Sequence, residues 1–419
     1  MTMLADLLST VFERRMRVAR TPEDDARSTQ ELADALVGAD GEISGQRLGR
    51  LILERFAGMS DDEKREFFGH LAHAMNFDPE AVRSALEDYE SNPGRATYAR
   101  FARAAEPKRQ ELMRRLNRVP HATGALVDMR ADLLRLGEDD PALGALDLDI
   151  QHLFSSWFNR GFLVLRPISW ESPAHILEKI IAYEAVHAIQ SWDDLRRRLE
   201  PTDRRCFAFF HPAMPDEPLI FVEVALTQGV PGSIQTLLSE DREGIVAQEA
   251  DTAVFYSISN CQAGLAKISF GNSLIKQVAA DLSLELPGLK TFVTLSPIPG
   301  LTAWTAERGL AIDDDPVRVQ ALAAYYLLEV KRPNGKPRDP VAHFHLGNGA
   351  ILHRVHAGAD LSEKGIAQSA GAMVNYLYDL AAVSQNHEGF ATTGAIAASP
   401  EVQAASTAAK KHFLEDAGP

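Results

Sequence analysis

The sequence predicts a helical N-terminal bundle followed by an α/β domain. Residues 1–165 carry repeated helix-start signals and no run of strand-forming residues. Short runs rich in Val, Ile and Phe begin near Gly161, and helical stretches lie between them. Strands that alternate with helices are typical of a layered α/β domain. We therefore expect two domains, residues 1–165 and 166–419, which suits a chain of 419 residues.

The first domain is predicted from its helix caps. Segments 28–31 and 60–63 read Ser-x-x-Glu, the capping box in which serine and glutamate each bond to a backbone N–H of the other. Segment 78–80, Asp-Pro-Glu, places an N-cap, a first-turn proline and a favourable carboxylate in order. Apolar residues then recur at spacings of three and four. We expect seven or eight helices, including an amphipathic one at residues 1–20.

The second domain is predicted from apolar runs bounded by Gly and Pro, which are strand signals. Strands are expected at 162–168, 206–212, 219–227, 252–259 and 291–298. Helices are expected at 173–188, 272–286 and 359–383, whereas the alanine-rich tail at 395–411 is either a final helix or a poorly ordered end.

Composition excludes several classes of protein. A net charge of −15 argues against non-specific nucleic-acid binding, because phosphates must be neutralised by positive charge. No apolar stretch approaches the length of a membrane span. Cys206 and Cys261 cannot form a disulfide framework and lack zinc-ligand spacing, so we expect no structural metal. We expect a reducing cytoplasm as the compartment.

The segment from 252 to 298 contains a candidate phosphate site. A strand is followed by a glycine-bearing loop that includes Lys267, and a helix begins near Asn272. The unpaired N–H groups of a first helical turn favour an anion. The alternative is an ordinary strand–helix connection in which the glycines only make a tight turn.

Two further motifs carry candidate chemistry. Ser296, in Leu-Ser-Pro-Ile-Pro-Gly, leaves the carboxyl end of a predicted strand, where side chains can meet a ligand. If the segment Ala-His-Phe-His-Leu forms a strand, His343 and His345 share one face. Such a pair can bind metal, but a single histidine that carries a proton or forms a hydrogen bond is the favoured interpretation. Each residue can also be purely structural.

The motifs together resemble those of the malonyl-CoA decarboxylase family. They are HPAMPDEPLIFVEVALT, VFYSIS-x-x-Q-x-GL, FGNSLIKQV, TLSPIPGL, DPVAHFHLGNGA and SxxGIxxSxGxMxNYxYDL, in the family's order from roughly residue 150 to residue 380. The resemblance implies an N-terminal helical domain and a catalytic domain similar to the CoA-dependent N-acetyltransferases. It implies conversion of malonyl-CoA to acetyl-CoA and CO2 without a cofactor, in a context of fatty-acid metabolism.

The resemblance also implies the site residues. The essential serine and histidine fall on Ser296 and His345. Substrate-binding positions fall on Lys179, Ser257 and Tyr376, the last within a predicted helix. The loop that holds the CoA phosphates falls on Ala266, Lys267, Ile268, Ser269, Phe270, Gly271 and Asn272. Ser269 and Ala174 depart from the acidic residue and the cysteine that other members carry.

Two other classes of function compete with this one. An acyl-CoA-dependent N-acyltransferase would share the fold and the CoA loop, but would need an amine acceptor. A non-catalytic CoA-ester sensor would bind malonyl-CoA without releasing CO2. We further expect a homodimer or homotetramer that forms through the helical domain, since an amphipathic bundle must bury its remaining apolar faces.

Overall fold

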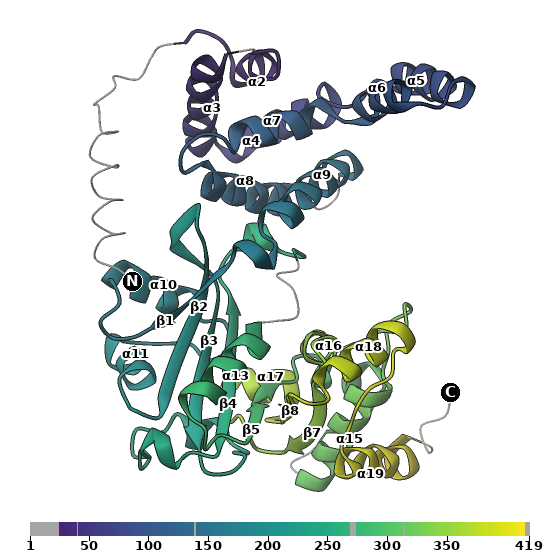
Figure 1. Ribbon diagram of the computed structural model, residues 1–419. Coiled ribbons are helices and arrows are strands. Elements are labelled where there is room, and N and C mark those ends of the chain that lie inside the picture. The colour runs from purple at the N-terminus through teal and green to yellow at the C-terminus, as the bar shows by residue number, and fades with distance from the viewer. Residues whose placement is uncertain (1–24, 40, 138–139, 269–273, 313–314, 415–419) are drawn as a thin grey trace. The chain divides into compact units, whose positions relative to one another are not determined.

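The structure is a computed structural model that describes residues 25–39, 41–137, 140–268, 274–312 and 315–414 (Figure 1). The predicted helix at residues 1–20 lies outside these ranges. None of the described helices combines the length and the apolar character that a membrane span requires. The chain packs as two compact units. One contains residues up to Ala122 and Leu136–Leu146, and the other contains Thr123–Arg135 and the chain from Asp147 onward. The predicted boundary was at residues 165 and 166.

The helical region has eight described helices, in line with the seven or eight expected. They are α2 (Thr29–Val37), α3 (Glu42–Ala57), α4 (Asp61–His73), α5 (Pro79–Ser91), α6 (Arg95–Ala105), α7 (Lys108–Leu116), α8 (Ala122–Leu136) and α9 (Pro141–Trp157). Both predicted capping boxes form, at the starts of α2 and α4. Pro79 is the first residue of α5 and follows the N-cap residue Asp78.

The second unit is built on one eight-stranded mixed sheet. Its strands are β1 (Val164–Ile168), β2 (Arg204–His211), β3 (Met214–Thr227), β4 (Thr252–Asn260), β5 (Thr291–Thr294), β6 (Ser296–Pro297), β7 (Ile351–His356) and β8 (Met373–Leu377). The order is β1-β2-β3-β4-β5-β8-β6, and β7 also pairs with β8. Only β4 and β5 pair in parallel. They pair from Thr252 to Phe255, so the end of β4 continues without β5.

Helices cover both faces of this sheet (Figure 1). They are α10 (Ala174–Tyr183), α11 (Trp192–Leu199), α12 (Ile234–Leu237), α13 (Leu274–Glu285), α14 (Leu301–Glu307), α15 (Pro316–Glu329), α16 (Pro340–Gly347), α17 (Glu363–Ser369), α18 (Val383–Thr393) and α19 (Pro400–Ala409). Side chains of α10 and α11 pack on Cys206, Ala208 and Phe210. Side chains of α13 and α15 pack in the cluster that contains Phe207 and Phe209. This alternation confirms the predicted class, a helical region followed by an α/β domain.

One segment that was considered as a strand, and one predicted helix, differ in the structure. The segment from 340 to 347 is a helix, because Asp339 caps it by accepting from the N–H of Ala342 at 2.8 Å and Pro340 occupies its first turn. The expected helix at 359–383 is two elements. Ala370 and Gly371, with φ of 50° and 76°, end α17 in the left-handed region, and β8 follows. Tyr376 therefore lies on a strand. The tail forms α19.

Candidate active site

Ser296 and His345 meet although 49 positions separate them in the chain. Ser296 begins the short strand β6, where the chain has left its pairing with β4 and pairs with β8. His345 lies in the last turn of α16. The serine Oγ is 3.2 Å from His345 Nε2, and both residues are buried. The structure thus brings together the two residues predicted to be catalytic.

Thr294 completes the surroundings of the serine. The hydroxyl of Ser296 donates to Thr294 Oγ1 at 2.8 Å. The same oxygen accepts from the backbone N–H of Tyr376 at 3.1 Å. Asn375 Nδ2 donates to the carbonyl of Thr294 at 2.8 Å. The end of β5 is therefore held to β8 by side chains, and the rotamer of Ser296 is set by a fixed acceptor.

Tyr378 fixes the other side of the imidazole. Its phenolic oxygen is 2.8 Å from His345 Nδ1. Burial raises the pKa of Tyr378 well above its ordinary value, so the phenol is neutral and can donate a hydrogen bond. If the phenol donates to Nδ1, the proton of the neutral imidazole sits on Nε2 and points at Ser296, which in turn donates to Thr294. Each group then donates a hydrogen bond to the next one, from Tyr378 to His345, from His345 to Ser296 and from Ser296 to Thr294.

The imidazole of His345 is uncharged. Burial lowers the pKa of His345 to about 3, because removal from water disfavours the charged imidazolium. The ring of Tyr376 stacks on it, with the centroids 4.5 Å apart and the planes 22° apart. The hydroxyl of Tyr376 is buried and has no hydrogen-bond partner among the described residues. Tyr376 therefore contacts His345 from strand β8, and its role in substrate binding stays a prediction.

Ser257 is committed to a different partner. A β-bulge in the β3–β4 pairing lies next to it, between Glu223 and Val224. Its hydroxyl donates to Glu184 at 2.6 Å, and the same carboxylate oxygen accepts from Ser259 at 3.3 Å. The hydrogen bonds of the described residues join Ser257 to neither Ser296 nor His345. Sequence reasoning missed Glu184, because only the fold brings it to β4.

Lys179 is also placed away from the pair. Its ammonium lies 2.5 Å from the carboxylate of Glu217 and 2.9 Å from the carbonyl of Asp216, at the start of β3. Of the predicted phosphate loop, Ala266, Lys267 and Ile268 are described, while Ser269 to Asn272 lie outside the described residues. Lys267 is exposed and adopts φ of 63°.

The metal interpretation of His343 and His345 is wrong. On a helix, residues two positions apart point to different sides. His343 packs 5.8 Å from the ring of Phe390, whereas His345 stacks on Tyr376. Within the described part of the chain, no group of three or more His, Cys, Asp or Glu side chains is arranged to hold a metal ion.

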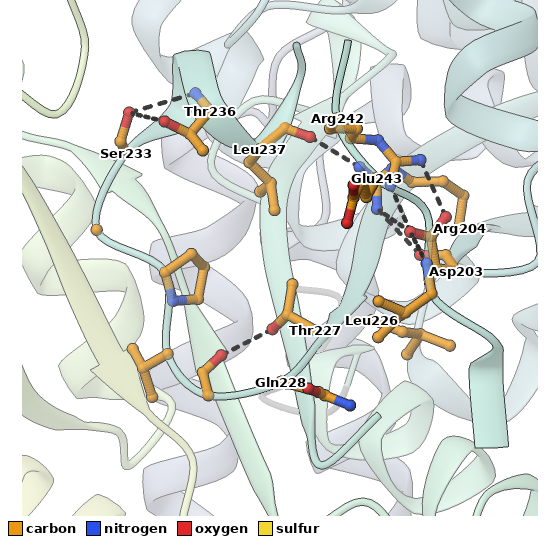
Figure 2. Close-up of a pocket in the computed structure, with 15 residues that line it drawn as sticks. Asp203, Arg204, Leu226, Thr227, Gln228, Ser233, Thr236, Leu237, Arg242 and Glu243 are labelled. Atoms are coloured by element: carbon orange, nitrogen blue, oxygen red, sulfur yellow. Dashed lines mark hydrogen bonds and ion pairs between the residues drawn. The ribbon is translucent and has the colours of Figure 1, made fainter. Parts of the chain in front are cut away.

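Neither of the two described cavities contains the serine or the histidine. One, of about 660 Å³, opens beside the loop after β3 (Figure 2). Three of its charged side chains already have partners, since Arg242 meets Asp203 and Arg204 donates to the carbonyl of Leu237 at 2.7 Å. The other, of about 590 Å³, is lined in part by Tyr378, Asp379 and Lys290.

Comparisons with known proteins agree with this arrangement. Residues 75–158 match the family described as Malonyl-CoA decarboxylase N-terminal domain, and residues 161–318 and 310–415 match Malonyl-CoA decarboxylase C-terminal domain. The mitochondrial malonyl-CoA decarboxylase of Anser anser anser is 36% identical over 349 residues, which are 71% of this chain and 69% of that protein. The enzyme of the same name from Mus musculus is 33% identical over 360 residues, 72% of each chain.

Solved structures are also similar. Crystal structures of malonyl-CoA decarboxylase from Rhodopseudomonas palustris and Agrobacterium vitis share 47% and 48% identity with this chain, each with a TM-score of 0.85. Both cover 90% of this chain, and 100% and 99% of their own. A buried Ser–His–Tyr chain of hydrogen bonds on a mixed sheet defines the class, an α/β enzyme equipped for proton transfer. The chain belongs to the malonyl-CoA decarboxylase family.

Proposed function

We propose that the protein converts malonyl-CoA to acetyl-CoA and CO2, with Ser296 and His345 at the reacting centre. Membership of the family supports the reaction. The observation that supports the centre is the unbroken series of hydrogen bonds from Tyr378 through His345 and Ser296 to Thr294. Because each group in this series donates to the next, Ser296 can give a proton to the substrate and take another from His345.

The reaction needs an electron sink, and the thioester supplies it. The bond between the carboxylate carbon and the adjacent CH2 breaks, its electron pair enters the thioester as an enolate, and CO2 leaves. The enolate carbon then gains one proton. No metal or other cofactor is needed in this proposal, because the negative charge rests on the thioester oxygen. The protein must orient the carboxylate and donate hydrogen bonds to that oxygen.

Ser296 is the proposed donor of that proton or the group that positions the malonyl unit. Its hydroxyl can turn from Thr294 to the substrate, while Nε2–H of His345 remains bonded to its oxygen. The imidazole and the Tyr378 hydroxyl then form the relay through which a proton from solvent restores the serine. General acid catalysis of this kind contributes about 10²- to 10⁴-fold in rate.

The CoA moiety is proposed to bind at the Ala266–Ile268 segment. Lys267 of this segment is exposed to solvent. In α13, the pKa of Lys276 is lowered mainly by burial and to a smaller extent by the positive charge of Arg160. None of the three cations pairs with a carboxylate among the described residues. In a protein with a net charge of −15, an exposed and unpaired cation such as Lys267 favours an anionic ligand such as the CoA phosphates.

Self-association through the helical region is part of the proposal. Helices α5 and α6 pack on each other, and Leu86 and Tyr98 stay 38% and 59% exposed. Helix α5 carries four acids and one arginine, while α6 carries three arginines and no acid. Two copies that pair α5 with α6 would match both charge and apolar surface. The compartment is a separate prediction, a reducing cytoplasm, although the named vertebrate relatives are mitochondrial.

One experiment tests the activity and its centre together. Chelator-treated protein is incubated with malonyl-CoA without any amine, and acetyl-CoA is followed by chromatography beside Ser296→Ala. Acetyl-CoA formed by the wild type and reduced at least about 100-fold in the variant supports the proposal. Intact malonyl-CoA overturns the reaction and directs attention to amine acceptors. Equal rates in both proteins remove Ser296 from the centre.

A further inference from the structure

Arg130 is a fully buried arginine in α8, a helix in which the sequence showed nothing catalytic. Its side chain is 0% exposed. The guanidinium donates to Asp147 at 2.7 Å, to the carbonyl of Gly264 at 2.7 Å and to the carbonyl of Ala266 at 3.0 Å. All of these residues belong to the same compact unit. A planar guanidinium thus joins two helices to the stem of one loop.

Such an arrangement is costly unless every donor is used. Taking an arginine out of water costs several kcal/mol, roughly, which its partners must offset. Here the partners are one carboxylate, the carbonyl of the buried Gly264, which would otherwise lack a donor, and the carbonyl of Ala266. The geometry therefore specifies where Gly264 and Ala266 lie, because moving either carbonyl leaves part of the guanidinium unpaired.

Gly264 shows how closely α8 approaches this loop. A Cβ at position 264 would lie 1.8 Å from the carbonyl oxygen of Val127, one turn before Arg130. No side chain fits there. The loop is consequently pressed against the backbone of α8 and held by the arginine from the same helix.

The residues held in this way lead directly into the proposed CoA-binding segment. Ala266 is followed by Lys267, whose φ of 63° is unusual for a lysine, and by Ile268, which is buried and donates to the carbonyl of Leu265 at 3.0 Å. The direction in which Lys267 projects is fixed by its two neighbours. Of these neighbours, Ala266 is held directly by Arg130 through its carbonyl.

We propose that Arg130, with Asp147, is a positioning residue for the CoA moiety. It holds the backbone of Gly264 and Ala266 so that the ammonium group of Lys267 meets the phosphates of CoA. The inference rests on the proposed function, since it concerns how that substrate binds. Arg130 contacts neither Ser296 nor His345, so its effect is on the binding of the nucleotide end of the substrate and not on the chemical step.

The test compares two substrates that share the malonyl thioester but differ in their phosphates. Arg130→Lys and Arg130→Met are assayed with malonyl-CoA and with malonyl-pantetheine, which has no phosphate. We expect the KM for malonyl-CoA to rise about tenfold or more in Arg130→Met, with kcat within about twofold, since only binding is lost. Arg130→Lys keeps the positive charge but lacks the planar guanidinium that reaches several acceptors at once. Its KM for malonyl-CoA should therefore lie between those of the wild type and Arg130→Met. The kcat/KM for malonyl-pantetheine should match that of the wild type.

A matched control separates positioning from a general loss of structure. Arg204→Met removes another buried arginine that donates to a backbone carbonyl, that of Leu237, in the same unit. Its effect should be equal for the two substrates. Asp147→Asn provides a milder variant if Arg130→Met does not fold. The inference is overturned if the Arg130 variants lose both substrates in parallel, or if their KM for malonyl-CoA is unchanged. A wild type that decarboxylates neither substrate rejects the proposed function instead.

Discussion

The phenolic oxygen of Tyr378 lies 2.8 Å from Nδ1 of His345, and this contact decides which nitrogen of the imidazole carries the proton. The hydroxyl of Tyr378 has no other hydrogen-bond partner among the described residues, so donation to Nδ1 is the arrangement that uses its proton. In that arrangement the proton of His345 sits on Nε2, 3.2 Å from Ser296. In this way a strand residue of β8 controls a serine on β6 through a histidine on α16.

Replacing Tyr378 with Phe removes the hydroxyl that sets the tautomer of His345 and changes the volume of the side chain very little. The imidazole is then free to adopt the other tautomer, with Nε2 unprotonated toward Ser296. A buried hydrogen bond of about 1.5–3 kcal/mol corresponds to a fall of roughly 10- to 100-fold in kcat. Steady-state kinetics should show this fall with KM nearly unchanged. Tyr325→Phe, in the same unit and stacked on Trp304, should match the wild type. A lowered affinity with normal kcat would contradict the tautomer argument.

Thr294 gives a second test, because its hydroxyl oxygen accepts from both Ser296 and the N–H of Tyr376. Thr294→Val keeps the shape and removes the acceptor, which leaves a buried N–H unpaired at a cost of about 1–3 kcal/mol. We expect a lower melting temperature and a lower kcat. Thr294→Ser restores the oxygen and should recover both quantities. If Val and Ser behave alike in both measurements, the hydroxyl of Thr294 has no part in holding Ser296.

The sequence predicted the elements whose signals are local. The capping boxes that begin α2 and α4 and the apolar runs of β2, β3 and β4 all formed at the expected positions. Each depends on residues within one turn or one strand. The helix α16 was missed although Asp339 and Pro340 are a helix start, because the alternation around His343 and His345 was interpreted as a strand.

The site could be predicted only where a motif marked it. Ser296 and His345 were identified by resemblance, and the structure joins them. Tyr378, Thr294 and Arg130 were not assigned roles. The partner of Tyr378 lies 33 residues away and that of Thr294 lies 2 residues away, while the partners of Arg130 lie 17, 134 and 136 residues away. A tyrosine, a threonine and an arginine in ordinary strands and helices carry no signal of their own. Tertiary packing determines which polar groups meet, and spacing along the chain does not.

The buried histidines predict how stability depends on pH. Burial lowers the pKa of His345 to about 3 and that of His187 to about 4, whereas the unfolded chain protonates histidine near 6.5. Between these values the unfolded state binds more protons, so the free energy of unfolding decreases as pH falls from about 6.5 toward 4. Urea unfolding at pH 7 and at pH 5 should show this decrease, and His187→Asn should reduce it. An equal decrease in the variant would exclude His187 as a contributor.

Glu223 predicts the opposite dependence as pH rises from about 4.3 to about 8. Its side chain is 0% exposed, and burial raises the pKa of its carboxyl to about 8, an effect that Arg198, 3.2 Å away, only partly opposes. The folded state keeps this proton up to about pH 8, whereas the unfolded carboxyl loses it near 4.3, so the stability that it contributes is lost as pH rises through 8. Glu223→Gln resembles the protonated acid and cannot ionise. Its melting temperature should therefore fall less than that of the wild type between pH 6 and pH 9, while the exposed control Glu240→Gln should follow the wild type. Parallel curves for Glu223→Gln and the wild type would show that the carboxyl is already ionised at pH 6.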